Sequence, residues 1–157
     1  MTARIAGISR DEEETREWGK RLAVYLRPGD VVGLVGELGA GKTRFAQGLA
    51  RGLGVPADTV ITSPTFTLLA IYESGRLPFY HFDFYRLETA VDLERIGAEE
   101  YLWGEGVCAV EWAERIPEAL PDETLYVNFV IDGDTRRLDF RGAAHRWREV
   151  LDTLVAE

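Results

Sequence analysis

Apolar side chains recur at helical spacing near the start of the chain. Trp18, Leu22, Tyr25 and Leu26 form one stripe, and Ser9-Arg10-Asp11-Glu12 precedes them with the pattern of a capping box. Pro28-Gly29 follows the stripe and ends it. The pattern predicts a helix from about residue 9 to residue 26.

The rest of the chain mixes strand-like and helical periods. Two strand-like runs, 68–72 and 77–83, are joined by the turn 73–76, and a second hairpin is predicted from 123–131 and 135–140. Residues 106–111 read as a buried strand, 88–102 as a helix broken near Gly97, and 144–156 as a closing helix. We therefore expect an α/β fold with a mixed parallel and antiparallel central sheet flanked by helices.

The segment from residue 30 to residue 51 carries the clearest motif. An apolar run, Asp30–Val35, leads into Gly36-Glu37-Leu38-Gly39-Ala40-Gly41-Lys42-Thr43, which matches G-x4-G-K-[ST] at every fixed position. Residues 42–51 then repeat apolar side chains on one helical face. Strand, glycine loop and helix in this order predict a P-loop NTPase fold.

Such a loop suits a nucleoside triphosphate because its backbone N–H groups and the helix N-terminus both attract phosphate oxygens. Lys42 is expected to reach the β- and γ-phosphates, and the Thr43 hydroxyl to ligate Mg²⁺. The N-K-x-D motif of guanine-specific GTPases is absent, since the only asparagine is Asn128 in Val-Asn-Phe-Val. Guanine specificity of that kind is therefore not expected.

Two carboxylates end strand-like runs, where a phosphate site would need them. Glu111 follows the apolar run 107–110, as in a Walker B element. It could instead be a first-turn residue of a helix beginning at Trp112. In 81–86, His81 and Asp83 share one face of an extended strand, either as an internal hydrogen-bonded pair or as groups that position Mg²⁺ and water. We interpret Asp83 as functional and His81 as structural. The loop Ser63–Phe66 is either a switch that closes on a γ-phosphate or an ordinary turn.

Size and composition indicate one domain over residues 1–157, with 46% hydrophobic residues. No apolar run is long enough for a membrane-spanning helix, and the single cysteine, Cys108, reads as a buried structural thiol. These features predict a cytoplasmic protein. The net charge of −9 disfavours unaided nucleic-acid binding, and the arginines at 136–148 read as a solvated face or as a docking surface.

Four segments together resemble one family, the small bacterial P-loop ATPases called TsaE or YjeE. They are 36–43, Ser-Pro-Thr-Phe-Thr-Leu at 63–68, His-Phe-Asp-Phe-Tyr-Arg-Leu at 81–87 and Val-Glu-Trp at 110–112. Past residue 120 only a hairpin with Arg136 can be matched. Arg44 departs from the Thr or Ser found in many relatives.

The resemblance implies Mg²⁺-dependent ATP binding and slow hydrolysis beside a TsaB–TsaD pair. That assembly adds threonylcarbamoyl to adenosine 37 of tRNA, and this chain would contact tRNA only through its partners. The expected cofactor-binding residues are Glu37, Leu38, Gly39, Ala40, Gly41, Lys42, Thr43, Arg44 and Thr65. The expected catalytic residues are Asp83, Glu111 and Lys42, and the expected metal ligands are Thr43 and Glu111.

Two other functions are compatible with a P-loop. A small-molecule kinase would need an acceptor pocket and usually an arginine-bearing lid, but the hairpin after the phosphate-loop helix and the absence of an obvious lid argue against it. A nucleotide-gated binding module would use ATP only to order the Ser63–Phe66 loop for docking.

Overall fold

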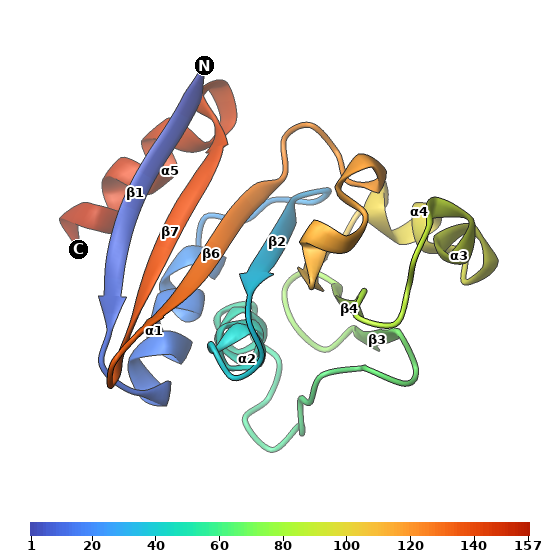
Figure 1. Ribbon diagram of the computed structural model, residues 1–157, viewed down its shortest axis with the longest axis horizontal. Coiled ribbons are helices and arrows are strands. Elements are labelled where there is room, and N and C mark those ends of the chain that lie inside the picture. The colour runs from blue at the N-terminus through green and yellow to red at the C-terminus, as the bar shows by residue number, and fades with distance from the viewer.

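The computed structural model describes residues 1–157 and contains one seven-stranded sheet (Figure 1). The spatial order of the strands is β1-β7-β6-β2-β5-β4-β3. The strands are β1 (Thr2–Ser9), β2 (Val31–Gly36), β3 (Leu69–Tyr72), β4 (Phe79–Asp83), β5 (Val107–Glu111), β6 (Leu125–Asp132) and β7 (Thr135–Ala143). Central strands run parallel, and both edges are antiparallel. The expected mixed α/β fold is confirmed.

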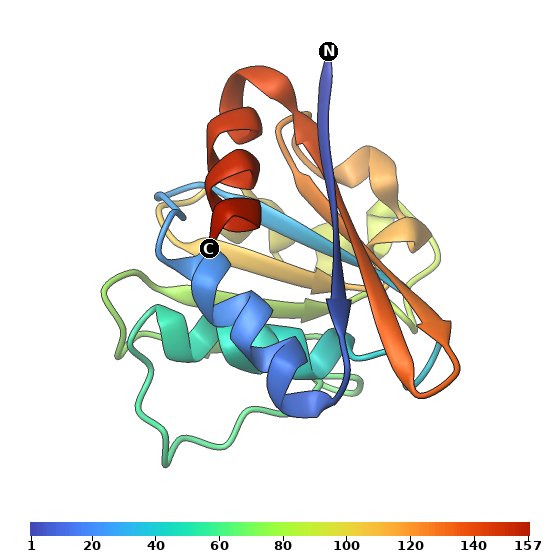
Figure 2. The same cartoon turned by 90° about the vertical axis from the view of Figure 1, so that its left-hand side faces the viewer.

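Helices cover the two faces of the sheet unequally. The larger hydrophobic core lies under α1 (Glu12–Ala23), α2 (Lys42–Gly52) and α5 (Ala144–Ala156), which Figure 2 shows together on one side. A smaller core on the other face lies under α3 (Ala90–Arg95), α4 (Ala98–Leu102) and the 3-10 turns η1 (Ala113–Arg115) and η2 (Pro117–Ala119). No helix is both long and apolar enough to cross a membrane.

Both predicted hairpins are present, and the helical segment 88–102 is broken at Gly97 as expected. The strand β1 was not predicted, because its inward face carries Ala3, Gly7 and Ser9 and so shows no apolar alternation. Gly7 is small for a reason: a Cβ there would lie 2.3 Å from the Trp18 ring.

Two local predictions were wrong. The N-cap of α1 is Asp11, whose carboxylate accepts from the Glu14 N–H at 2.8 Å. Ser9 instead is wholly buried and bonds the Thr15 hydroxyl. After Glu111 the chain makes only the short 3-10 turn η1 rather than a helix, because Trp112 adopts a left-handed backbone conformation.

The arginines at 136–148 do not form one surface. Arg146 is buried and pairs with Asp30 at 2.6 Å, Arg137 pairs with Asp139, and Arg136 faces the cavity described below. Cys108 is buried as expected, and burial raises the pKa of its thiol. Neither a single basic patch nor a reactive thiol is present.

The first two helices pack with their backbones almost in contact. A Cβ added to Gly48 of α2 would lie 2.0 Å from the carbonyl oxygen of Arg16, and one on Gly19 of α1 would lie 2.3 Å from that of Phe45. Because α2 begins at the phosphate-loop motif, this contact holds the start of α1 beside the loop.

The substitution Gly48→Ala tests this close packing, because the steric clash and the higher helix propensity of alanine change the stability in opposite directions. Propensity alone would stabilise the protein by up to about 1 kcal/mol, whereas overpacking of this kind costs about 1–3 kcal/mol. Because the clash is with backbone, we expect a cost at the upper end of that range and a net loss of about 2 kcal/mol in the free energy of unfolding, measured by urea denaturation. The exposed Glu149→Ala in α5 should stay within about 0.5 kcal/mol of wild type. A stabilised Gly48→Ala variant would contradict the observed packing.

Candidate functional site

The glycine loop between β2 and α2 has the conformation that its motif requires. Gly41, the N-cap of α2, has a φ of 113°, which side chains disfavour. A Cβ on Gly36 would lie 2.8 Å from the carbonyl oxygen of Phe129 on the neighbouring strand β6. The loop therefore depends on both fixed glycines of the motif, and it directs the N-terminus of α2 into a cavity.

Lys42 lies beneath this loop. Its Nζ donates to the carbonyl oxygens of Gly36 and Glu37 and lies 4.1 Å from the centroid of the Trp112 ring. Burial lowers the pKa of its ammonium group, and the nearby carboxylate of Glu111 opposes that shift. Trp112 has a φ of 58°, a strained value for a bulky residue, and its ring packs on Tyr85. The backbone at Trp112 thus turns its ring over the lysine.

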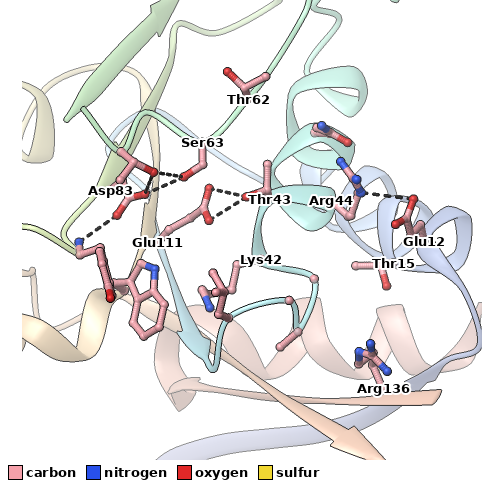
Figure 3. A pocket seen from close by; sticks show the side chains of 18 of the residues that line it. Glu12, Thr15, Lys42, Thr43, Arg44, Thr62, Ser63, Asp83, Glu111 and Arg136 are labelled. Atoms are coloured by element: carbon pink, nitrogen blue, oxygen red, sulfur yellow. Dashed lines mark hydrogen bonds and ion pairs between the residues drawn. The ribbon is translucent and has the colours of Figure 1, made fainter. Parts of the chain in front are cut away.

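Thr43 and Glu111 meet at the centre of the site, as Figure 3 shows. The Thr43 hydroxyl lies 2.9 Å from Oε1 and 3.1 Å from Oε2 of Glu111. Thr43 comes from the first turn of α2, and Glu111 ends β5, which pairs in parallel with β2. Parallel pairing brings the carboxyl ends of both strands to the same edge of the sheet, so the two oxygen-bearing side chains converge.

Asp83 ends β4 and is the register partner of Glu111. Its Oδ2 accepts a hydrogen bond from Ser63 Oγ at 2.6 Å (Figure 3). The same oxygen accepts a second one from Thr65 Oγ1 at 3.1 Å. Its Oδ1 accepts from the Tyr85 N–H at 2.8 Å. Asp83 and His81 face the same side of the strand but are not paired with each other. Asp83 instead holds the loop at 62–67, while His81 reaches Glu111.

One cavity of about 690 Å³ collects these groups. The predicted residues that line it are Leu38, Gly39, Ala40, Gly41, Lys42, Thr43, Arg44, Thr65, Asp83 and Glu111. Glu37 does not line it and takes part only through its carbonyl oxygen, which accepts from Lys42. Arg44 points its guanidinium at Glu12, 3.3 Å away (Figure 3).

The end of the cavity away from Asp83 was not predicted from the sequence. It is lined by Asp11, Glu12 and Thr15 from the start of α1, and by Asp134 and Arg136 from the β6–β7 hairpin. Figure 3 shows Thr15 and Arg136 across the loop from the carboxylates. Asp11 and Glu12 carried a helix-start signal, and the hairpin carried only a turn signal. No local pattern could show that both segments reach the loop.

The side chains of the site supply only part of the coordination that Mg²⁺ needs, unless a nucleotide is bound as well. Thr43 and Glu111 offer hard oxygen ligands, but no cluster of three or more His, Cys, Asp or Glu side chains could hold an ion. Mg²⁺ is typically bound by one or two protein oxygens together with phosphate oxygens and water. The site therefore fits a metal ion that arrives with phosphate rather than one held by the protein alone.

The chain is similar to known proteins along most of its length. The family model for "Threonylcarbamoyl adenosine biosynthesis protein TsaE" matches residues 9–138. The tRNA threonylcarbamoyladenosine biosynthesis protein TsaE of Bacillus subtilis (strain 168) is 43% identical over 143 residues, 90% of this chain and 88% of the relative. The protein of the same name from Treponema pallidum (strain Nichols) is 47% identical over 130 residues, 83% of this chain and 94% of the relative.

A solved structure shows the same architecture. The crystal structure of YdiB from Bacillus subtilis superposes with a TM-score of 0.84 at 36% identity, covering 99% of this chain and 97% of that one. The family match spans the glycine loop, Asp83, Glu111 and the β6–β7 hairpin up to Leu138. The chain therefore belongs to the TsaE family of threonylcarbamoyl adenosine biosynthesis proteins.

Proposed function

We propose that this protein is a Mg²⁺-dependent ATP-binding and ATP-hydrolysing subunit of the complex that adds threonylcarbamoyl to adenosine 37 of tRNA. The observation that carries the ATPase part is the contact of Thr43 with Glu111, beside Lys42 and Asp83 in a single cavity. Membership of the TsaE family supports the tRNA-modification part. We expect such a subunit to act in the cytoplasm, where tRNA is modified.

The glycine loop would bind the phosphates of ATP. Residues 38–44, at the start of α2, line the cavity, and entering phosphate oxygens would replace the carbonyls of Gly36 and Glu37 as partners of Lys42 Nζ. Lys42 and the loop amides would also stabilise the charge that develops on the transferred phosphoryl group. The rest of the nucleotide would extend toward Thr15 and Arg136 at the other end of the cavity.

Thr43 and Glu111 would hold Mg²⁺ bound to ATP, directly or through water. When bound, the ion supplies positive charge to the β- and γ-phosphate oxygens. Glu111 is 3% exposed, so its carboxylate is shielded from solvent and its contact with Thr43 is correspondingly strong.

Asp83 would support hydrolysis by positioning the attacking water. In the structure both of its oxygens already accept hydrogen bonds, and two of the donors belong to the loop at 62–67. A change in that loop would therefore free Oδ2, so the state of the loop and the capacity for hydrolysis are linked through one carboxylate.

The link between the loop at 62–67 and Asp83 also favours a second candidate function, that of a nucleotide-gated binding module. If the loop of Ser63 and Thr65 is the partner-docking element, ATP binding alone would alter it and hydrolysis would only reset it. An Asp83 variant that cannot hydrolyse ATP but still supports tRNA modification would select this candidate.

Lys42→Ala tests the nucleotide site. Loss of a charged contact worth about 1.5–3 kcal/mol should weaken ATP binding by about 10- to 100-fold, measured by equilibrium titration. The matched control is Lys20→Ala, which removes the chain's only other lysine, an exposed one on α1. Equal affinity of Lys42→Ala and Lys20→Ala would reject the site.

Asp83→Asn and Glu111→Gln test hydrolysis separately from binding. Each keeps the shape of its side chain, so ATP affinity measured in EDTA should stay within about threefold, while phosphate release with Mg²⁺ falls by about 10²- to 10⁴-fold. The exposed Glu94→Gln in α3 is the control and should hydrolyse normally. Product analysis also separates an ATPase, which releases free phosphate, from a kinase, which releases ADP only with a phosphorylated acceptor.

The partners are tested by adding a purified TsaB–TsaD pair to this protein and ATP. We expect slow phosphate release by the chain alone and a severalfold rise with the pair, because the complex uses hydrolysis to cycle. ATPase activity that does not change when the pair is added would be compatible with the ATP site but would reject this role in tRNA modification.

A further inference from the structure

His81 is the most deeply buried ionisable side chain at the site. Its exposed fraction is 0%, and its Nε2 lies 2.6 Å from Oε2 of Glu111. The ring lies on the same face of β4 as Asp83 and stacks on Phe79, with centroids 6.0 Å apart. Its position on the strand and its stacking together fix the plane of the imidazole ring. The sequence alone had indicated only a structural role for His81.

The two partners of the Glu111 carboxylate act differently on it. Thr43 Oγ1 is nearly equidistant from Oε1 and Oε2, at 2.9 and 3.1 Å, so its hydroxyl does not select either oxygen. His81 contacts only Oε2. An ionised Glu111 carboxylate could only accept this hydrogen bond, and the contact then requires the tautomer of His81 that carries its proton on Nε2. His81 is therefore the group that distinguishes the two oxygens.

The other ring nitrogen argues against a purely structural role. Nδ1 is buried without any hydrogen-bond partner, so the ring acts on polar surroundings only through Nε2. A phenylalanine, as at the neighbouring positions 79, 82 and 84, would fill the space without burying an unpaired polar atom. The imidazole carries a stability cost that its contact with Glu111 explains.

We propose that His81 is a positioning residue, which commits Oε2 of Glu111 to the protein and leaves Oε1 directed at the metal–nucleotide site. This inference rests on the proposed Mg²⁺-ATP function. Groups that orient a metal-side carboxylate from behind act through its geometry, and their loss typically costs 10- to 100-fold in metal affinity or activity. His81 touches neither phosphate nor the reacting atoms in this assignment.

The test compares His81→Gln with His81→Asn. A glutamine amide reaches the position of Nε2, whereas an asparagine amide reaches only that of Nδ1, and both variants lose the ring. Affinity for a non-hydrolysable ATP analogue is titrated with Mg²⁺ and with EDTA, and the ratio of the two Kd values measures coupling to the metal. Phosphate release with ATP gives kcat and KM, and urea denaturation reports stability.

We expect the EDTA affinity of both variants to match wild type within about threefold. His81→Asn should lose about 10- to 100-fold in Mg²⁺ coupling, and because hydrolysis is slow its KM for Mg²⁺-ATP should rise by the same factor. His81→Gln should recover most of both losses. Equal losses in the two variants, or unchanged coupling in a folded His81→Asn, would overturn the inference. Failure of the wild type to bind the analogue at all would instead reject the proposed function.

Discussion

The parallel register of β2, β5 and β4 is the constraint on which the site depends. Leu34 of β2 pairs with Glu111 of β5, and Glu111 pairs with Asp83 of β4. The glycine loop follows β2, so it lies two strands away from Asp83. A slip of one residue in either pairing would turn a carboxylate to the other face of the sheet, into the smaller hydrophobic core. The nearly continuous apolar sequences of β2 and β5, buried on both faces, make such a slip costly.

Charge at the site is unbalanced within the protein itself. Glu111 and Asp83 are both buried, and both carboxylates act on the pKa of Lys42. Burial of Lys42 favours its neutral form, whereas the nearby carboxylates favour its charged form. Burial has the larger effect, so the pKa of Lys42 is lowered. A divalent cation brought in with a triphosphate would offset the carboxylates, and the triphosphate would in turn compensate Lys42. Nucleotide and metal ion are thus expected to bind cooperatively.

Side chains of three separate segments hold the two carboxylates in place. Thr43 and His81 hold Glu111, whereas Ser63 and Thr65 hold Asp83. The first pair belongs to α2 and β4, which are regular elements, and the second pair belongs to a loop. This division suits a site in which the metal-side carboxylate stays fixed while the water-side carboxylate responds to loop movement.

Local patterns in the sequence by themselves determined the glycine loop, both hairpins, the helix break at Gly97 and the strand ends that carry Asp83 and Glu111. These features arise from periodicity and backbone preferences over a few neighbouring residues, so a single sequence reveals them. Only the tertiary structure decided that α1 and the β6–β7 hairpin close the far end of the cavity, that Arg146 is buried against Asp30 and that His81 holds Glu111. Those contacts join residues 30 or more positions apart, and they depend on strand order and helix packing, which local periodicity does not specify.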